Sequence, residues 1–271
     1  MNRMAAEAVS KSRTEPDNAA VAEDQQSAIA NESAVAGLEG VPCLPPYPSR
    51  VVLSAGAGPA GAESFRFLAH RLQLIRQKRP LCSLLVTSAS PKEGKTIVAT
   101  NLALTLLQTR RTLLIDCDLR SPSVHRLFGI DSRPGVAEYL AGTHGLDSVL
   151  CRLEPFGLAF LSAGSCQGDP VELLRESKVR QLLETLRSSF DWIILDSPPV
   201  NLVAESAYLS SLCDGTVLVV RSGVTRRQDF EQATTTLEGS FLAGVLMNAS
   251  DEANERGYHY YASERGEGAR G

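Results

Sequence analysis

The feature that most constrains this fold is a short loop between an apolar run and a helix-forming run. Residues 81–86 are mostly apolar, residues 87–96 read Thr-Ser-Ala-Ser-Pro-Lys-Glu-Gly-Lys-Thr, and residues 97–108 favour a helix. A strand, a tight loop and a helix in this order bring backbone N–H groups and the positive end of the helix together, which favours an anion. Lys95 is suited to contact the β- and γ-phosphates of a nucleotide, and the Thr96 hydroxyl is suited to hold Mg²⁺. The spacing predicts a phosphate-binding loop, although Ala89 stands where the strict pattern has glycine.

The nucleotide is expected to lie against the whole loop and the start of the following helix. Lys92 is interpreted as a solvated loop charge, because a signature lysine of partition ATPases would stand two positions earlier, where this chain has a serine. The loop residues predicted to surround the nucleotide are Ser90, Pro91, Lys92, Glu93, Gly94, Lys95, Thr96 and Ile97.

Apolar and amphipathic segments alternate along the rest of the chain. Near-continuous apolar runs such as 192–195 and 216–220 are typical of parallel strands covered on both faces. Strands are predicted at 82–87, 112–117, 157–162, 191–196, 215–221 and 242–247. Helices are predicted at 62–78, 94–109, 134–142, 170–187, 202–211 and 226–237. The alternation predicts a three-layer α/β domain over residues 51–250, with a mostly parallel central sheet and ligands at the carboxyl ends of its strands.

Acidic residues end two of these predicted strands. Asp116 and Asp118 lie two positions apart, which directs both carboxylates to one side of the chain. Asp196 ends a second apolar strand. Because Mg²⁺ is usually held by one or two carboxylates together with water and phosphate, these residues and Thr96 are predicted to form a Mg-nucleotide site.

Both ends of the chain differ in composition from this domain. Residues 1–50 are rich in Ala, Ser, Glu, Asp and Pro and are predicted to be disordered, and residues 251–271 are predicted to form a mobile tail. A net charge of −4 implies no general attraction to nucleic acid. No apolar run is long enough to cross a bilayer, and the six cysteines lack zinc-site spacing, so the chain is expected to be cytoplasmic.

The three motifs together resemble those of the bacterial tyrosine autokinases, the BY-kinases of capsule and exopolysaccharide systems. The resemblance lies in the loop at 88–96, in Ile-Asp-Cys-Asp-Leu-Arg at 115–120 and in Leu-Asp-Ser-Pro-Pro at 195–199. It extends over roughly residues 62–250 and includes the segments 135–142, 170–174 and 214–221. It implies a P-loop kinase that uses ATP and Mg²⁺ and phosphorylates tyrosines of its own tail.

The resemblance also implies roles for residues outside the loop. Glu63 and Arg66, on the predicted helix 62–79, resemble the family's oligomerisation element, whose last position is Ala69 here. Asn248 matches a position that contacts adenine. The tail tyrosines Tyr258, Tyr260 and Tyr261 resemble the family's phosphoacceptor cluster.

In-line phosphoryl transfer needs positioning and neutralisation of charge more than covalent chemistry. Lys95 and Mg²⁺ would supply the positive charge, and a carboxylate would accept the proton of the tyrosine, whose pKa is ordinarily about 10. Asp118 is the preferred base, with Asp116 as the alternative. Arg120 is predicted either to contact phosphate or acceptor, or to form a surface ion pair.

The family implies partners as well: a separate transmembrane polysaccharide co-polymerase or adaptor at the inner face of the membrane, further copies of the chain, and an opposing tyrosine phosphatase. Two other functions stay open from the sequence. One is a Min/Par-like localisation ATPase that uses nucleotide only to switch its dimer state. The other is a non-catalytic nucleotide-binding regulatory subunit, which Ala69, Ala89 and the short tyrosine cluster favour.

Overall fold

The structure, a computed structural model, describes residues 37–45, 50–51, 59–174 and 176–249. Within them the chain forms one sheet with the strand order β1-β4-β5-β3-β6-β2-β7-β8. The strands are β1 (Glu39–Pro42), β2 (Ser83–Ser88), β3 (Thr112–Asp116), β4 (Leu150–Glu154), β5 (Leu158–Leu161), β6 (Trp192–Asp196), β7 (Gly215–Arg221) and β8 (Leu242–Asn248). Every neighbouring pair is parallel except β4 and β5, which form an antiparallel pair.

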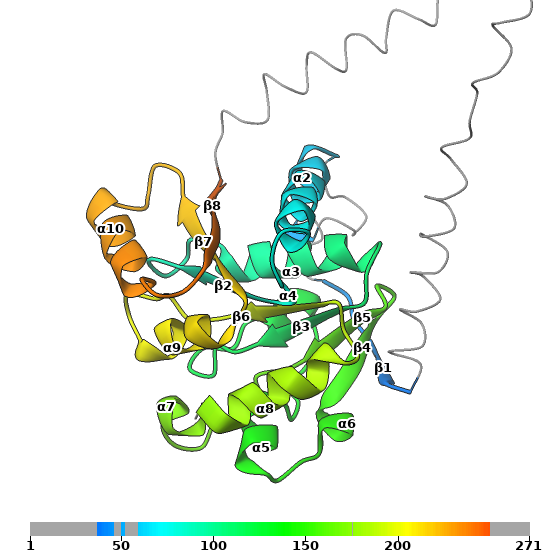
Figure 1. The fold of residues 1–271 in the computed structure, drawn as a ribbon. Coiled ribbons are helices and arrows are strands. Elements are labelled where there is room, and N and C mark those ends of the chain that lie inside the picture. Colours follow the sequence, from blue (N-terminus) through cyan, green and yellow to red (C-terminus); the bar gives the residue numbers. More distant parts are fainter. Residues whose placement is uncertain (1–36, 46–49, 52–58, 175, 250–271) are drawn as a thin grey trace, which may run out of the picture.

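Helices cover both faces of this sheet (Figure 1). They are α2 (Pro59–Arg76), α3 (Lys95–Leu107), α4 (Val124–Phe128), α5 (Val136–Ala141), α6 (Leu146–Val149), α7 (Pro170–Leu173), α8 (Glu176–Arg187), α9 (Ala204–Leu212) and α10 (Arg227–Thr236). Buried residues of α2, α3 and α4 pack on one face, and those of α5, α8 and α9 pack on the other. This three-layer, mostly parallel α/β architecture is the predicted fold class.

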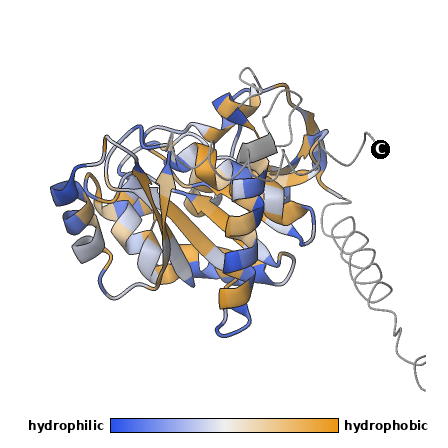
Figure 2. Cartoon of the chain, turned by 90° about the horizontal axis from the view of Figure 1, so that it is seen from above, coloured by the Kyte–Doolittle hydropathy of each residue, from blue (hydrophilic) through white to orange (hydrophobic). Residues whose placement is uncertain are grey.

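Two hydrophobic cores lie on opposite faces of the sheet, and successive side chains of a central strand enter them alternately. Leu84 and Val86 of β2 join the core beneath α3, whereas Leu85 between them joins the opposite core. Trp192 and Ile193 of β6 divide in the same way. Figure 2 shows hydrophobic residues concentrated in the central strands. A strand buried on both faces reads as a continuous apolar run, which is why the sequence predicted β2, β6 and β7 closely.

Two elements differ from expectation. Residues 1–50 were predicted to be mostly disordered, and within them Glu39–Pro42 forms β1, a strand that was not predicted and that pairs with β4. An edge strand is held by backbone hydrogen bonds, and its few apolar contacts, from Val41 and Cys43, give no sequence periodicity. The predicted helix 170–187 is two helices, α7 and α8, in different orientations (Figure 1).

Candidate active site

The site lies at the carboxyl ends of three adjacent central strands, β2, β6 and β3. In the sheet register, Val86 and Asp116 both lie beside Asp196, one on each neighbouring strand. Each strand continues into a loop on the same edge, so residues more than a hundred positions apart meet there. This is the edge at which the sequence predicted ligand binding.

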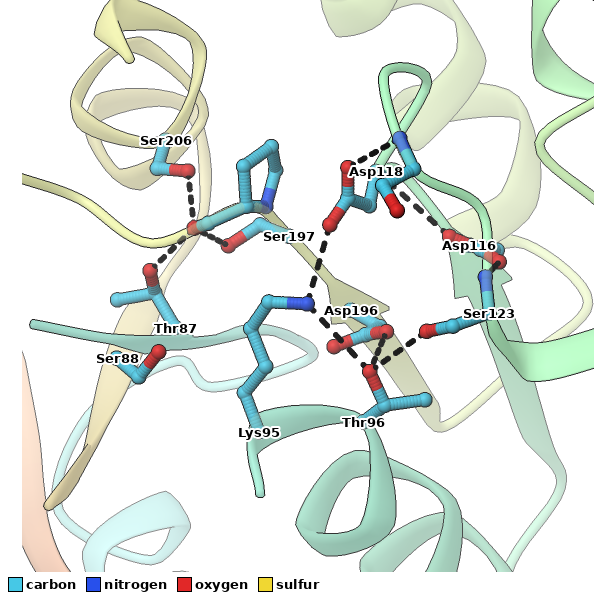
Figure 3. A network of polar contacts seen from close by, with 12 residues as sticks. Thr87, Ser88, Lys95, Thr96, Asp116, Asp118, Ser123, Asp196, Ser197 and Ser206 are labelled. Atoms are coloured by element: carbon cyan, nitrogen blue, oxygen red, sulfur yellow. Dashed lines mark hydrogen bonds and ion pairs between the residues drawn. The ribbon is translucent and has the colours of Figure 1, made fainter. Parts of the chain in front are cut away.

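Lys95 stands at the centre of the site, on the first turn of α3 (Figure 3). Its Nζ lies 3.1 Å from Oδ2 of Asp118 and donates to the Thr96 hydroxyl at 3.4 Å. Burial lowers the pKa of Lys95, but the carboxylates of Asp196, Asp118 and Asp116 raise it, and the net shift is upward. Lys95 is therefore a charged ammonium group surrounded by acids.

Thr96 and Asp196 form the second part of the site. The Thr96 hydroxyl donates to Oδ2 of Asp196 at 2.7 Å and lies 3.0 Å from the Ser123 hydroxyl. The other oxygen of Asp196, Oδ1, is buried and has no hydrogen-bond partner among the described residues. Burial chiefly raises the pKa of Asp196, to about 7. An unsatisfied acceptor beside a hydroxyl suits a divalent cation that retains water and phosphate ligands.

Asp116 and Asp118 have different surroundings. Asp116 accepts three backbone N–H groups, from Asp118 at 3.1 Å, Ser123 at 3.0 Å and Val124 at 3.1 Å. Burial nevertheless raises its pKa to about 6. Asp118 accepts the N–H of Ser121 through Oδ1, while its Oδ2 faces Lys95. Asp116 therefore shapes the loop after β3, whereas Oδ2 of Asp118 is the oxygen of the pair that faces Lys95 and accepts no backbone N–H.

The phosphate-binding loop contains two left-handed residues. Lys92 has φ 63° and Gly94 has φ 96°. The φ of Gly94 favours glycine, and a Cβ atom there would also displace the Asn248 side chain, whose Nδ2 would lie 2.1 Å away. Asn248 donates this Nδ2 group to the carbonyl of Glu93 at 2.9 Å, which ties the end of β8 to the loop.

Arg120 forms an ion pair in the structure. Its Nη2 lies 2.6 Å from Oε1 of Glu205 and 3.7 Å from Oδ1 of Asp169. Glu205, only 2% exposed in the first turn of α9, was missed from the sequence. Ser123 was missed too. For both Glu205 and Ser123, the signal in the sequence was a position shortly after one of the acidic motifs.

Other predicted residues lie away from this cluster. Glu63 and Arg66 are on the exposed side of α2, where their side chains pair at 2.9 Å. Tyr258, Tyr260 and Tyr261 lie outside the described residues. The described residues hold no group of three or more His, Cys, Asp or Glu arranged as a metal site by themselves.

Fold and site together define a P-loop α/β protein with a lysine and carboxylates converging on a phosphate position. The chain is 31% identical over 206 residues to tyrosine-protein kinase YwqD of Bacillus subtilis, covering 75% of this chain and 87% of YwqD. It is 33% identical over 193 residues to tyrosine-protein kinase CpsD of Streptococcus pneumoniae, covering 70% of this chain and 84% of CpsD. The chain belongs to the bacterial tyrosine kinases of capsule and exopolysaccharide loci, as the sequence motifs predicted.

The solved structures agree with this family. The kinase domain of the Escherichia coli tyrosine kinase Etk is 27% identical, with a TM-score of 0.68, and the match covers 81% of this chain and 92% of that domain. The chain spans only 27% of the length of the whole Etk protein. McdA of Cyanothece, at 20% identity and a TM-score of 0.52, shares the fold. No protein-family model matches the chain.

Among the described residues, no helix is both long and apolar enough to span a membrane.

Two buried carboxylates give the nucleotide-free protein an expected pH dependence. The pKa values of Asp116 and Asp196, about 6 and about 7, lie above the ordinary 3.8. Their contribution to stability is therefore fully present below that ordinary pKa and is lost as the pH rises through the two folded-state values. Urea unfolding without nucleotide or Mg²⁺ should show a stability about 4 kcal/mol higher near pH 5 than near pH 8 from this source.

The Asp196→Asn variant isolates that contribution, because it removes the group with the larger shift. Its unfolding free energy should change less between the two pH values than that of the wild type. Equal pH dependence in the two proteins would contradict the assignment.

Proposed function

We propose that this chain is a MgATP-dependent protein-tyrosine autokinase that transfers the γ-phosphoryl group of ATP to tyrosines of its own C-terminal tail. The observation that carries the proposal is the convergence of Lys95, Thr96, Asp118 and Asp196 at one sheet edge. An ammonium group at the end of a phosphate-binding loop, facing a carboxylate that can accept a proton, is what phosphoryl transfer requires.

Each residue has a role in this proposal. The loop residues 90–97 surround the phosphates and bind them through backbone N–H groups, except Pro91, which has none, and Ser90, whose N–H donates to Glu93. Lys95 turns from Asp118 to the β- and γ-phosphates. Thr96 and Asp196 would hold Mg²⁺, directly or through water, and the metal would neutralise charge on the phosphates. Asn248 would contact adenine with the amide atoms that its bond to Glu93 leaves available.

Asp118 is the proposed base. When Lys95 turns to the phosphates, Oδ2 of Asp118 loses its hydrogen-bond partner and can accept the proton of the tyrosine hydroxyl. The tyrosine oxygen then bonds to the γ-phosphorus, the bond from that phosphorus to the β–γ bridging oxygen breaks, and ADP leaves. Asp116 is less suited, since both its oxygens already accept backbone N–H groups. Arg120 is expected to contact phosphate or acceptor only if it leaves Glu205.

The proposed phosphoacceptors are Tyr258, Tyr260 and Tyr261. The tail begins just after β8, whose last residue, Asn248, already contacts the phosphate-binding loop. We further propose, from family membership, that the kinase works in the cytoplasm at the inner face of the membrane with a transmembrane co-polymerase or adaptor. Homo-oligomers formed through Glu63 and Arg66, and an opposing tyrosine phosphatase, belong to the same proposal.

Mass spectrometry after incubation with MgATP tests the function directly. The full chain should gain phosphate on tail tyrosines, and a chain ending at Arg256 should gain none there while still binding ATP. An adaptor peptide is an appropriate activator if basal activity is low. ATP binding without phosphotyrosine under both conditions would favour a regulatory subunit, and stimulation of ATP hydrolysis by DNA or lipid without protein phosphorylation would favour a localisation ATPase.

A further inference from the structure

One residue of the phosphate-binding loop is an acid, like the phosphate groups that the loop is expected to bind. Glu93 is an acid in a loop that is suited to bind anions, yet its side chain is almost fully buried, with only 1% of the residue exposed. Its oxygens face away from solvent and have defined partners: Oε2 accepts the N–H of Ser90 at 3.1 Å, and Oε1 accepts the hydroxyl of Thr225 at 2.6 Å. A buried carboxylate persists only where such partners satisfy it.

Thr225 lies in the turn between β7 and α10, 132 positions from Glu93. Its hydroxyl has one proton, which it donates to Glu93, and it accepts the backbone N–H of Arg221 at 2.7 Å. The backbone N–H of Thr225 donates to the carbonyl of Arg221 at 3.0 Å. The donor and the acceptor of each hydrogen bond from Arg221 through Thr225 to Glu93 are therefore fixed. Thr225 thus supports the Glu93 carboxylate in one orientation.

A second contact joins the same turn to the loop. Nη1 of Arg221 donates to the carbonyl of Lys92 at 3.1 Å. Lys92 is held at φ 63°, a conformation that a residue with a Cβ atom adopts at a cost. Gly94, two positions later, also has a positive φ of 96°, and left-handed residues of this kind occur in anion-binding nests. Contacts from outside the loop therefore hold the backbone at Lys92 and the side chain of Glu93.

We propose that Glu93, Thr225 and Arg221 form a brace that holds the phosphate-binding loop in its binding conformation before ATP arrives. The brace rests on the proposed function, because ATP is the ligand assumed. In this role Glu93 and Thr225 are positioning residues: their side chains act through the loop backbone and contact no phosphate. Without the brace only a fraction of molecules would present a formed loop, and the apparent dissociation constant for ATP would rise by the inverse of that fraction.

Isothermal titration calorimetry of the full chain with MgATP tests the brace. Thr225→Val keeps the size of the side chain and removes the hydroxyl; it should weaken ATP binding by about tenfold. Thr225→Ser keeps the hydroxyl and should bind like the wild type. The matched control is Thr236→Val, whose hydroxyl contacts only the carbonyl of Gln232 in its own helix. Steady-state phosphorylation should show a raised KM for ATP with a smaller change in kcat.

Glu93→Gln separates the brace from simple charge repulsion. If the carboxylate only repelled phosphate, its neutralisation would tighten ATP binding. The brace requires the opposite result, because an amide NH₂ group cannot accept the bond from Thr225 or from the Ser90 N–H that it replaces. Tighter binding by Glu93→Gln, or wild-type binding by Thr225→Val, would overturn the proposal.

The same titrations distinguish a failed brace from a failed function. A wild-type chain that binds no ATP would refute the proposed function itself. A wild-type chain that binds ATP, with Thr225→Val indistinguishable from it, would refute only the brace. Melting curves of the variants without ATP confirm that each is folded before its affinity is compared.

Discussion

Replacing Lys95 by methionine is expected to lower tail phosphorylation by at least about a hundredfold. Lys95 forms an ion pair with Asp118 at 3.1 Å, and in the proposed mechanism its ammonium group neutralises charge that builds up on the γ-phosphoryl group. Methionine retains much of the length of the side chain but cannot neutralise that charge. Radiolabelled ATP or phosphotyrosine-specific detection measures the loss.

Lys78→Met is the matched control, because Lys78 is an exposed lysine close to the end of α2, outside the catalytic cluster. It should retain wild-type activity. Removal of Lys95 also leaves buried carboxylates without their cation, so circular dichroism near pH 6, where these acids are partly protonated, verifies that the variant is folded. A folded Lys95→Met protein with wild-type activity would contradict the assigned role.

Gly135→Ala is expected to destabilise the fold by about 3 kcal/mol or more, since two backbone segments would have to separate. A Cβ atom on Gly135 would lie 1.8 Å from the carbonyl oxygen of Ser162 and 2.9 Å from the N–H nitrogen of Gly164. Neither neighbour is a side chain that can rotate away. The φ of Gly135, −159°, is ordinary extended backbone, so the effect is one of space alone.

Thermal unfolding measures this effect, with an expected fall in Tm of roughly 6–12 °C for a domain of this size. Gly145→Ala is a control in the same part of the chain. Gly145 has φ −76°, and nothing lies within 4 Å of the Cβ atom that alanine would add. Its Tm should change little. Equal melting temperatures for the two variants would show that residues 162–164 can move without cost.

The central strands and the helices beside them were predictable because burial on two faces leaves a strong mark on the sequence. β2, β6 and β7 are runs of apolar residues, and each was predicted to within a residue or so of its observed bounds. β4 was not predicted: Leu150–Glu154 contains Arg152 and Glu154, which pair with each other at 2.7 Å at the edge of the core. Its buried residues, Leu150, Cys151 and Leu153, are too few and too interrupted to read as an apolar run.

The candidate site was likewise predictable only in part from the sequence. Spacing alone identified Lys95, Thr96 and the acids at the strand ends, because each follows a recognisable strand and the parallel sheet brings those ends together. The spacing of the motifs did not show that both oxygens of Asp116 accept backbone N–H groups, or that Arg120 pairs with Glu205. These contacts depend on the conformations of the loops that follow β3 and β6 at the carboxyl edge of the sheet. No sequence separation encodes the contact between Glu93 and Thr225.

The arrangement of β2, β6 and β3 has a consequence for the order of folding. The catalytic groups belong to segments that are distant along the chain and meet only through strand pairing, such as Asp116 with Asp196. Non-local pairings of this kind form late, because closing the intervening loops costs entropy before the contacts form. Half-assembled chains should therefore lack affinity for ATP, and recovery of binding during renaturation should coincide with completion of the sheet.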